Sequence, residues 1–490
     1  MNELKKKYGL FTAICMVVGI VIGSGVFFKA QTVLNNTGGN MLQGVLAWII
    51  GGAIMISCIL AFSVLAQKYE KINGIIDYAE MTVGNKYAYL IGWFMTVLYY
   101  PTMTSVLAWV SARYFITFIC NAVPGFALHI SAEAGGAVVG PETLTLACFL
   151  LVLTFSINAI APKIAGKIQI STTVIKLIPL LLMAVIGTIY GLSHPITEAA
   201  PVTILQSNFS QPVESWSFLF AAVVSTAFAY EGWIIATSIN AELKNSKRNL
   251  PIALVVGGLI IVAVYVFYFI GVSGGASVDV LRDPSQGAPV AFINVFGPTF
   301  GNILNLFVAI SCFGTLNGIM LGCTRGLYSV AVRGFGPRPQ IFCQVDKETN
   351  MPVNSSIVAV LLTALWLVYF YGANLSAGKP WFGPFSFDSS ELPIVTTYAF
   401  YLPIFIRFMI KEKNLSFVKR FVLPSLALIG AGTMVGMAIY AHGIAPYMAA
   451  KNAEEPYFSC PILYYLILFA VIMAIGIFFM NDKKKAKKIK

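Results

Sequence analysis

Charged residues are scarce in this chain. Asp, Glu, Lys and Arg account for 11% of its 490 residues, while 58% of the residues are hydrophobic. Soluble domains carry about 25% charged residues. The mean hydropathy of +0.80 fits a chain that runs largely through lipid. The composition therefore excludes a soluble enzyme and predicts an all-α polytopic membrane protein.

Histidine and cysteine are too scattered to predict a metal site or a disulfide framework. The three histidines lie far apart, and the eight cysteines form no CxxC or Cys/His metal spacing. Most of the cysteines fall within or beside apolar runs, as buried small residues do. We expect neither a metal nor another cofactor.

Twelve apolar runs approach or exceed the roughly 20 residues that cross a bilayer. They lie near 9–34, 41–66, 85–118, 143–162, 166–192, 215–241, 251–273, 299–332, 354–373, 391–411, 419–441 and 460–480. The first run is too long for a cleaved signal peptide, so we expect it to be retained. The loop after the second run lacks the acidic and twin-basic signature of major facilitator transporters, which disfavours that twelve-helix class.

The distribution of positive charge predicts the topology. With a cytoplasmic N-terminus, 25 of the 32 Lys and Arg residues fall in cytoplasmic segments and four, among them Lys29, fall outside. The positive-inside rule then places both termini in the cytoplasm of a multi-pass plasma-membrane protein. The net charge of +12 is explained by this topology and by anionic lipid, so we expect no nucleic-acid partner.

A cluster of small residues lies in the middle of the first run, at Gly23-Ser24-Gly25. Glycine frees the backbone from helical geometry, and broken backbone at membrane depth is tolerated only inside protein or beside a water-filled cavity. The half-helix after such a break would direct free N–H groups at a small carboxylate. The alternative is that Gly19 and Gly23 form an ordinary GxxxG helix-packing face.

A second interruption is predicted in the sixth run, at Phe228-Ala229-Tyr230-Glu231-Gly232. Two interrupted helices five apart are typical of transporters built from two inverted repeats of five helices. Glu231 is either a protonated structural acid, the partner of a lysine, or a residue of the cavity. Tyr99 in the third run is treated as a packing residue.

Lys176 lies about ten residues from either end of the fifth run, near the membrane midplane. A cation at that depth is costly, and it points to function or to a fixed structural charge rather than to a side chain that reaches the interface.

Together these motifs resemble the amino acid-polyamine-organocation superfamily, and within it a bacterial member of the L-amino acid transporter family. The resemblance runs from the first to the eighth helix, and the last four match in general character. It rests on Gly23-Ser24-Gly25-Val26-Phe27, on 228–233, on Lys176 and on Phe313-Gly314-x-x-Asn317-Gly318 with Arg325 and Tyr328. One departure is the loop 69–74, where relatives commonly have Tyr-Pro-x-x-Gly-Gly.

The resemblance implies a LeuT-like core of ten helices in two inverted repeats, residues 1–411, followed by two peripheral helices and a basic cytoplasmic tail, residues 412–490. It also implies that the substrate lies between helices one and six. Its carboxylate would meet the N–H groups of Ser24 and Gly25, and its ammonium would meet carbonyls around Val21 and from Phe228 through Ala229 to Glu231. Phe228 would be the gate on the outer side, and Lys176 would replace the sodium ion of related transporters.

These features predict a sodium-independent amino acid transporter that exchanges small or medium neutral L-amino acids by alternating access. The alternatives are a cationic or broad-range exchanger and a proton-coupled symporter, because relatives that take cationic amino acids carry an acid at the position of Glu231. A passive channel and a membrane-embedded enzyme are less well supported. The expected partners are the amino acid and the lipid bilayer, without an obligate partner subunit.

Overall fold

The computed structural model describes residues 9–69, 74–123, 140–161, 164, 168, 171–172, 175–197, 202–236, 243–283, 287–348, 351–375, 380–452 and 460–480. Across these ranges the regular structure is helical, apart from isolated bridge residues such as Pro195 and Thr203, which form an antiparallel bridge. An all-α fold is expected in lipid, because a helix satisfies its backbone hydrogen bonds within one segment.

The first apolar run forms two helices rather than one. α1 (Leu10–Val21) and α2 (Gly25–Asn36) are separated by residues 22–24, and Ile22 has extended backbone with ψ of 103°. The cluster of small residues thus ends one helix and begins the next, as the sequence predicted. α3 (Met41–Lys68) follows, with the Asn40 side chain accepting a hydrogen bond from the Gln43 amide at 2.9 Å.

The sixth run is also broken at the predicted place. α12 (Phe218–Ala229) and α13 (Trp233–Ala236) flank a turn in which Gly232 has φ of +104°. Few residues other than glycine adopt that conformation without strain. The end of the predicted run, 237–241, lies outside the described residues.

The remaining helices follow the predicted order. The third run comprises α5 (Asn85–Phe94), the π-helical turn η1 (Met95–Tyr99) and α6 (Tyr100–Ala122), and the fourth is α7 (Pro141–Ile160). The fifth comprises α9 (Leu177–Leu182), the π-helical turn η4 (Met183–Gly187) and α10 (Thr188–Ser193). The seventh to tenth are α14 (Ser246–Gly275), α17 (Pro298–Thr324) with α18 (Gly326–Ala331), α20 (Val353–Phe370) with the π-helical turn η6 (Tyr371–Leu375), and α21 (Leu392–Lys411).

The eleventh run is longer than predicted. The π-helical turn η8 (Val418–Val422), α22 (Leu423–Ile439), the π-helical turn η9 (Tyr440–Ile444) and α23 (Ala445–Asn452) form one continuous helical span to residue 452, whereas hydropathy placed its end at 441. Helical backbone continues here after the apolar stretch has ended, because surface turns need no apolar side chains. α24 (Pro461–Met480) is the twelfth helix.

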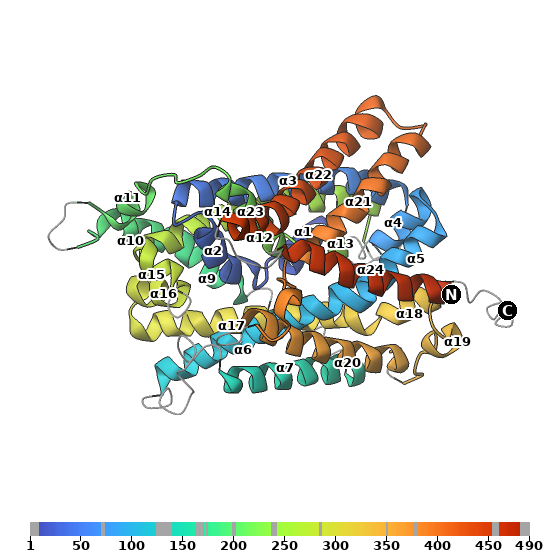
Figure 1. Cartoon of the computed structure of the whole chain (residues 1–490), viewed down its shortest axis with the longest axis horizontal. Coiled ribbons are helices and arrows are strands. Elements are labelled where there is room, and N and C mark those ends of the chain that lie inside the picture. The colour runs from blue at the N-terminus through green and yellow to red at the C-terminus, as the bar shows by residue number, and fades with distance from the viewer. Residues whose placement is uncertain are drawn as a thin grey trace.

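Short helices cap the two ends of the molecule. α4 (Ile75–Thr82), α18 and α19 (Pro339–Phe342) lie at one end, and α10, α11 (Ile204–Phe209), α15 (Val278–Arg282) and α16 (Ala288–Phe296) lie at the opposite end (Figure 1). We call these the α4 end and the α15 end. α15 and α16 connect the seventh and eighth helices and pack on α2 and on α17, respectively.

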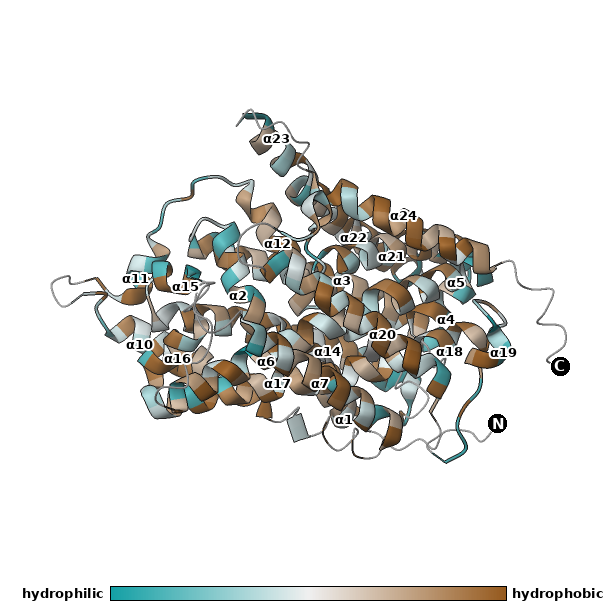
Figure 2. Cartoon of the chain, turned by 60° about the horizontal axis from the view of Figure 1, so that its bottom comes forward, coloured by the Kyte–Doolittle hydropathy of each residue, from teal (hydrophilic) through white to brown (hydrophobic). Residues whose placement is uncertain are grey.

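The described helices match a membrane protein of twelve spans. Nine are long and apolar enough to cross a bilayer, and three shorter apolar helices belong to the interrupted first, fifth and sixth runs. Hydrophobic residues cover peripheral helices such as α24 (Figure 2). The division into a core and a peripheral pair at residue 411 stays a prediction.

Close contact between the fifth and seventh segments depends on glycine. A Cβ on Gly271 of α14 would lie 2.1 Å from the Met183 carbonyl oxygen, and one on Gly274 would lie 2.2 Å from the Gly187 carbonyl oxygen. Both neighbours are backbone atoms, which cannot rotate away. Membrane helices commonly use small residues to approach so closely.

We therefore expect Gly271→Ala to lower the apparent melting temperature in detergent, because overpacking typically costs about 1–3 kcal/mol. Gly436→Ala on α22 is the matched control, since its Cβ would meet no atom within 4 Å. An unchanged melting temperature for Gly271→Ala beside Gly436→Ala would contradict this packing.

Candidate functional site

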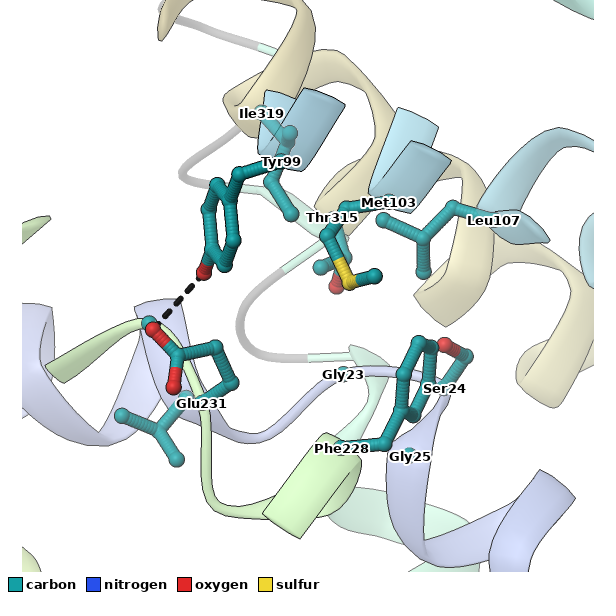
Figure 3. A pocket seen from close by; sticks show the side chains of 12 residues that line it. Gly23, Ser24, Gly25, Tyr99, Met103, Leu107, Phe228, Glu231, Thr315 and Ile319 are labelled. Atoms are coloured by element: carbon teal, nitrogen blue, oxygen red, sulfur yellow. Dashed lines mark hydrogen bonds between the residues drawn. The ribbon is translucent and has the colours of Figure 1, made fainter. Parts of the chain in front are cut away.

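The two helix breaks face a shared cavity between α2, α12, α6 and α17. It contains about 420 Å³ of empty space, including the part open to solvent. The lining residues are Val21, Gly23, Ser24, Gly25, Tyr99, Met103, Leu107, Phe228, Glu231, Gly232, Thr315 and Ile319. Figure 3 shows Glu231 and Tyr99 at one end of this cavity, and Ser24, Phe228 and Leu107 at the other.

The first break supplies hydrogen-bond donors to this cavity. The Ser24 carbonyl accepts the Phe28 amide at 2.9 Å, so α2 begins here, and the amides of its first turn have no intrahelical acceptor. The Ser24 hydroxyl is buried and has no hydrogen-bond partner among the described residues. A helix N-terminus with free amides favours a negatively charged group.

The two breaks touch at Gly25 and Ala229. A Cβ on Gly25 would lie 2.3 Å from the Ala229 Cα, and one on Gly23 would lie 2.6 Å from the Thr315 hydroxyl oxygen. Glycine at these positions thus serves close approach as well as helix breaking. Ala229 does not line the cavity itself; it forms the contact that brings the second break against the first.

Tyr265 of α14 bridges the carbonyl side of both breaks. Its hydroxyl lies 3.1 Å from the Val21 carbonyl oxygen and 3.0 Å from the Ala229 carbonyl oxygen, and its side chain is fully buried. One hydroxyl proton is shared between two acceptors, each of which has a further lone pair. Tyr265 was not predicted from the sequence, because nothing in α14 alone indicates which carbonyls its side chain reaches.

Glu231 lies in the second break and points toward the third helix. Its Oε1 accepts a hydrogen bond from the Tyr99 hydroxyl at 2.7 Å, while Oε2 is buried and has no hydrogen-bond partner among the described residues (Figure 3). No ion pair of Glu231 occurs in the described part of the chain. Tyr99, for which the sequence favoured a packing role, also lines the cavity.

Phe228 covers the α2 side of the cavity. It is 8% exposed, and its ring lies edge-on to Phe28 with 5.9 Å between centroids. Met103, Leu107 and Ile319 contribute apolar surface to the other walls. These three were not predicted, since apolar residues in apolar helices carry no distinguishing signal.

Lys176 lies outside the cavity, next to the end of α1. It is fully buried, and its ammonium donates a hydrogen bond to the Gly19 carbonyl. A helix that ends within the membrane leaves its last carbonyls without intrahelical donors, and Lys176 supplies one. The arrangement agrees with a fixed cation beside broken helix one.

The motif at 313–318 of α17 makes contacts with two other helical segments. Asn158 of α7 donates to the Asn317 side-chain oxygen at 2.8 Å. Gly314 lies beside the fifth segment, where an added Cβ would meet the Thr172 hydroxyl oxygen at 2.1 Å. The motif 313–318 thus positions α17, which carries Thr315 and Ile319 to the cavity.

Comparison with known proteins identifies related sequences along almost the whole chain. The amino acid permease family model matches residues 8–487. The chain is 28% identical to the serine/threonine exchanger SteT of Bacillus subtilis over 446 residues, which cover 89% of this chain and 92% of the relative. It is 27% identical to the rat large neutral amino acids transporter small subunit 2 over 365 residues, covering 74% of this chain and 65% of the relative. The chain is 24% identical to the human cystine/glutamate transporter over 380 residues, which cover 76% of this chain and 70% of the relative.

Proposed function

The chain belongs to the amino acid permease family, and we propose that it exchanges small or medium neutral L-amino acids across the plasma membrane by alternating access. The observation that carries the proposal is the cavity at both helix breaks, which is lined at the start of α2, where amides lack intrahelical acceptors, and at the ends of α1 and α12, where carbonyls lack intrahelical donors. An α-amino acid is a zwitterion, so its carboxylate and its ammonium need these two kinds of partner. Discontinuous helices serve that purpose in this class of transporter.

In this proposal the carboxylate binds the amides of Ser24 and Gly25. The ammonium binds carbonyls around Val21 and from Phe228 to Glu231, sharing two of them with Tyr265. Phe228 acts as the gate. The apolar walls favour a neutral substrate side chain.

A cationic or broad-range substrate is the second candidate. The observation in its favour is the unpartnered Oε2 of Glu231 at the cavity. The enzyme and channel hypotheses lack comparable support: Glu231 is the one acid among the twelve lining residues, and the Ser24 hydroxyl has no base beside it in the described chain.

We propose that the α4 end faces the cytoplasm, together with both termini. Lys68, Lys86, Arg333 and Arg338 belong to segments at this end, as the positive-inside rule requires. The rat relative is named a small subunit, whereas the Bacillus relative is named an exchanger without that term. We propose that this chain also works without an obligate partner subunit.

Exchange predicts that proteoliposomes loaded with an amino acid take up labelled amino acid, and that empty vesicles do not. The substrates tested would be those that raise the melting temperature in a screen of the twenty amino acids, since a ligand of the folded state stabilises it. Equal uptake into empty vesicles would refute exchange.

Binding of the carboxylate by the first break predicts that amines and amino acid esters compete poorly with the parent amino acid. Loss of the carboxylate charge removes hydrogen bonds worth about 1.5–3 kcal/mol each, or more than tenfold in affinity. An amine that inhibits as strongly as its parent amino acid would remove Ser24 and Gly25 from the carboxylate site.

The role of Lys176 as a substitute for sodium predicts a steep loss of transport in Lys176→Ala, because the Gly19 carbonyl loses its charged donor. The loss should exceed about tenfold, and an imposed sodium gradient should have no effect on the wild type. Lys86→Ala, an exposed cation at the start of α5, is the control. Wild-type uptake that followed the sodium gradient would contradict this assignment.

The two substrate candidates are separated by Glu231→Gln, assayed with alanine and arginine. A neutral-substrate exchanger should transport alanine and reject arginine in the wild type. An exchanger in which ionised Glu231 pairs with the substrate should lose arginine transport in the variant and keep alanine. Unchanged rates for both substrates would mean that Glu231 is structural.

A further inference from the structure

A buried cation lies on α2, about one turn beyond the cavity. The topology predicted from the sequence counts Lys29 among the four cations on the outer side. In the structure its side chain is buried, with 1% exposure. Its ammonium lies 2.6 Å from Glu391 Oε1 and 3.5 Å from Asp388 Oδ2, both just before α21. This ion pair joins residues 362 positions apart in the chain.

The same cluster reaches the gate and the eleventh helical span. The Lys29 ammonium lies 5.1 Å from the ring centroid of Phe28 and 5.7 Å from that of Phe228. On the other side, His442 Nε2 of η9 lies 3.2 Å from Glu391 Oε2. Glu391 thus has both oxygens engaged, and it is 3% exposed.

The ion pairs of Lys29 lie beside the path that leads from the α15 end into the cavity. α2 runs from the cavity toward the α15 end, where its Asn35 donates to the Arg282 carbonyl at 3.3 Å. Phe228, Ser24 and Leu107 lie at one end of the cavity, away from Tyr99 (Figure 3). A route from the α15 end therefore passes α2, which carries Lys29, and Phe228, whose ring lies beside the Lys29 ammonium.

We propose that Lys29, Glu391 and Asp388 form a latch that holds α2 against the start of α21 and keeps the cavity closed toward the α15 end. Opening on that side separates the Lys29 ammonium from Glu391, and closing restores the pair. Removing one partner of a buried pair leaves the other charge uncompensated, so the pair strongly favours the closed arrangement. The latch rests on the proposed function, in which the α15 end faces outward and transport alternates access.

An ion pair that acts as a latch differs from a purely structural ion pair in its effect on the ratio of open to closed conformations. Loss of a purely structural pair destabilises all conformations alike and leaves their ratio unchanged. Loss of a latch destabilises the closed arrangement selectively and shifts the population toward the open one. The decisive quantity is therefore access to the cavity from the α15 side, measured beside overall stability.

The experiment measures labelling of Leu107→Cys by a membrane-impermeant thiol reagent added to intact cells. We expect Lys29→Met to raise the labelling rate several-fold over the same reporter with Lys29 intact. Labelling of native cysteines, of which Cys15 and Cys148 are exposed, is measured in chains without the reporter and subtracted. Lys29→Arg retains the charge and should label at a rate close to that of the Lys29 protein.

Arg282→Met is the matched control, because it removes a cation that contacts α2 at Asn35 without an ion-pair partner in the described chain. Its labelling rate should not change. Where Lys29→Met fails to accumulate as folded protein, Glu391→Gln provides the same test, since it leaves Lys29 with Asp388 alone. A lower melting temperature with unchanged reporter labelling would overturn the latch.

Two further measurements distinguish failure of the latch from failure of the proposed function. Asp279→Cys, exposed on α15, should label in intact cells if the α15 end faces outward. Exchange by the wild type in proteoliposomes tests transport independently of labelling. Labelling unaffected by Lys29→Met in a chain that exchanges amino acids refutes the latch alone, whereas absent exchange refutes the function.

Discussion

Backbone groups left unpaired by the two helix breaks are the constraint on which the rest of this structure depends. Lipid offers them no partner, so the surrounding helices must supply one or enclose a cavity. The chain does both. Lys176 donates to the Gly19 carbonyl and Tyr265 to those of Val21 and Ala229, while Ser24 and Gly25, at the start of α2, line the cavity. Three carbonyls at the breaks thus have donors within the protein, and the proposed substrate site uses the backbone groups that line the cavity.

The breaks themselves were predictable, since glycine clusters are local signals. Gly23 and Gly25 lie where the first helix ends and the second begins, and Gly232 has the positive φ that favours glycine. The close approach of Gly25 to Ala229 was not predictable, because it joins helices that lie some 200 residues apart in the chain. The same holds for Tyr265, whose role depends on two carbonyls in other helices.

Single charged residues within apolar helices were a good guide to the site, whereas the count of cations on each side of the membrane was misleading for Lys29. Glu231 and Lys176 were conspicuous because a charge in an apolar helix is costly, and the structure buries both beside the breaks. Lys29 was assigned to the outside by the same sequence, although its side chain turns inward to Glu391. A helix end that is near the interface can direct a lysine either to water or into protein, and sequence alone does not distinguish these directions. The eleventh span was cut short for a related reason, because hydropathy follows the apolar stretch and not the backbone.

α2 connects the cavity with the α15 end of the molecule. Ser24 and Gly25 lie at its start, Lys29 follows about one turn later, and Asn35 contacts α15 near its end. Twelve residues of helix extend about 18 Å and move as one body. A group bound at the first turn of α2 and the carboxylates that hold Lys29 therefore act on one rigid element. In the latch that we propose, a tilt of α2 that tightens contacts at the cavity also changes the distance between Lys29 and Glu391, and this couples occupancy of the cavity to closure toward the α15 end.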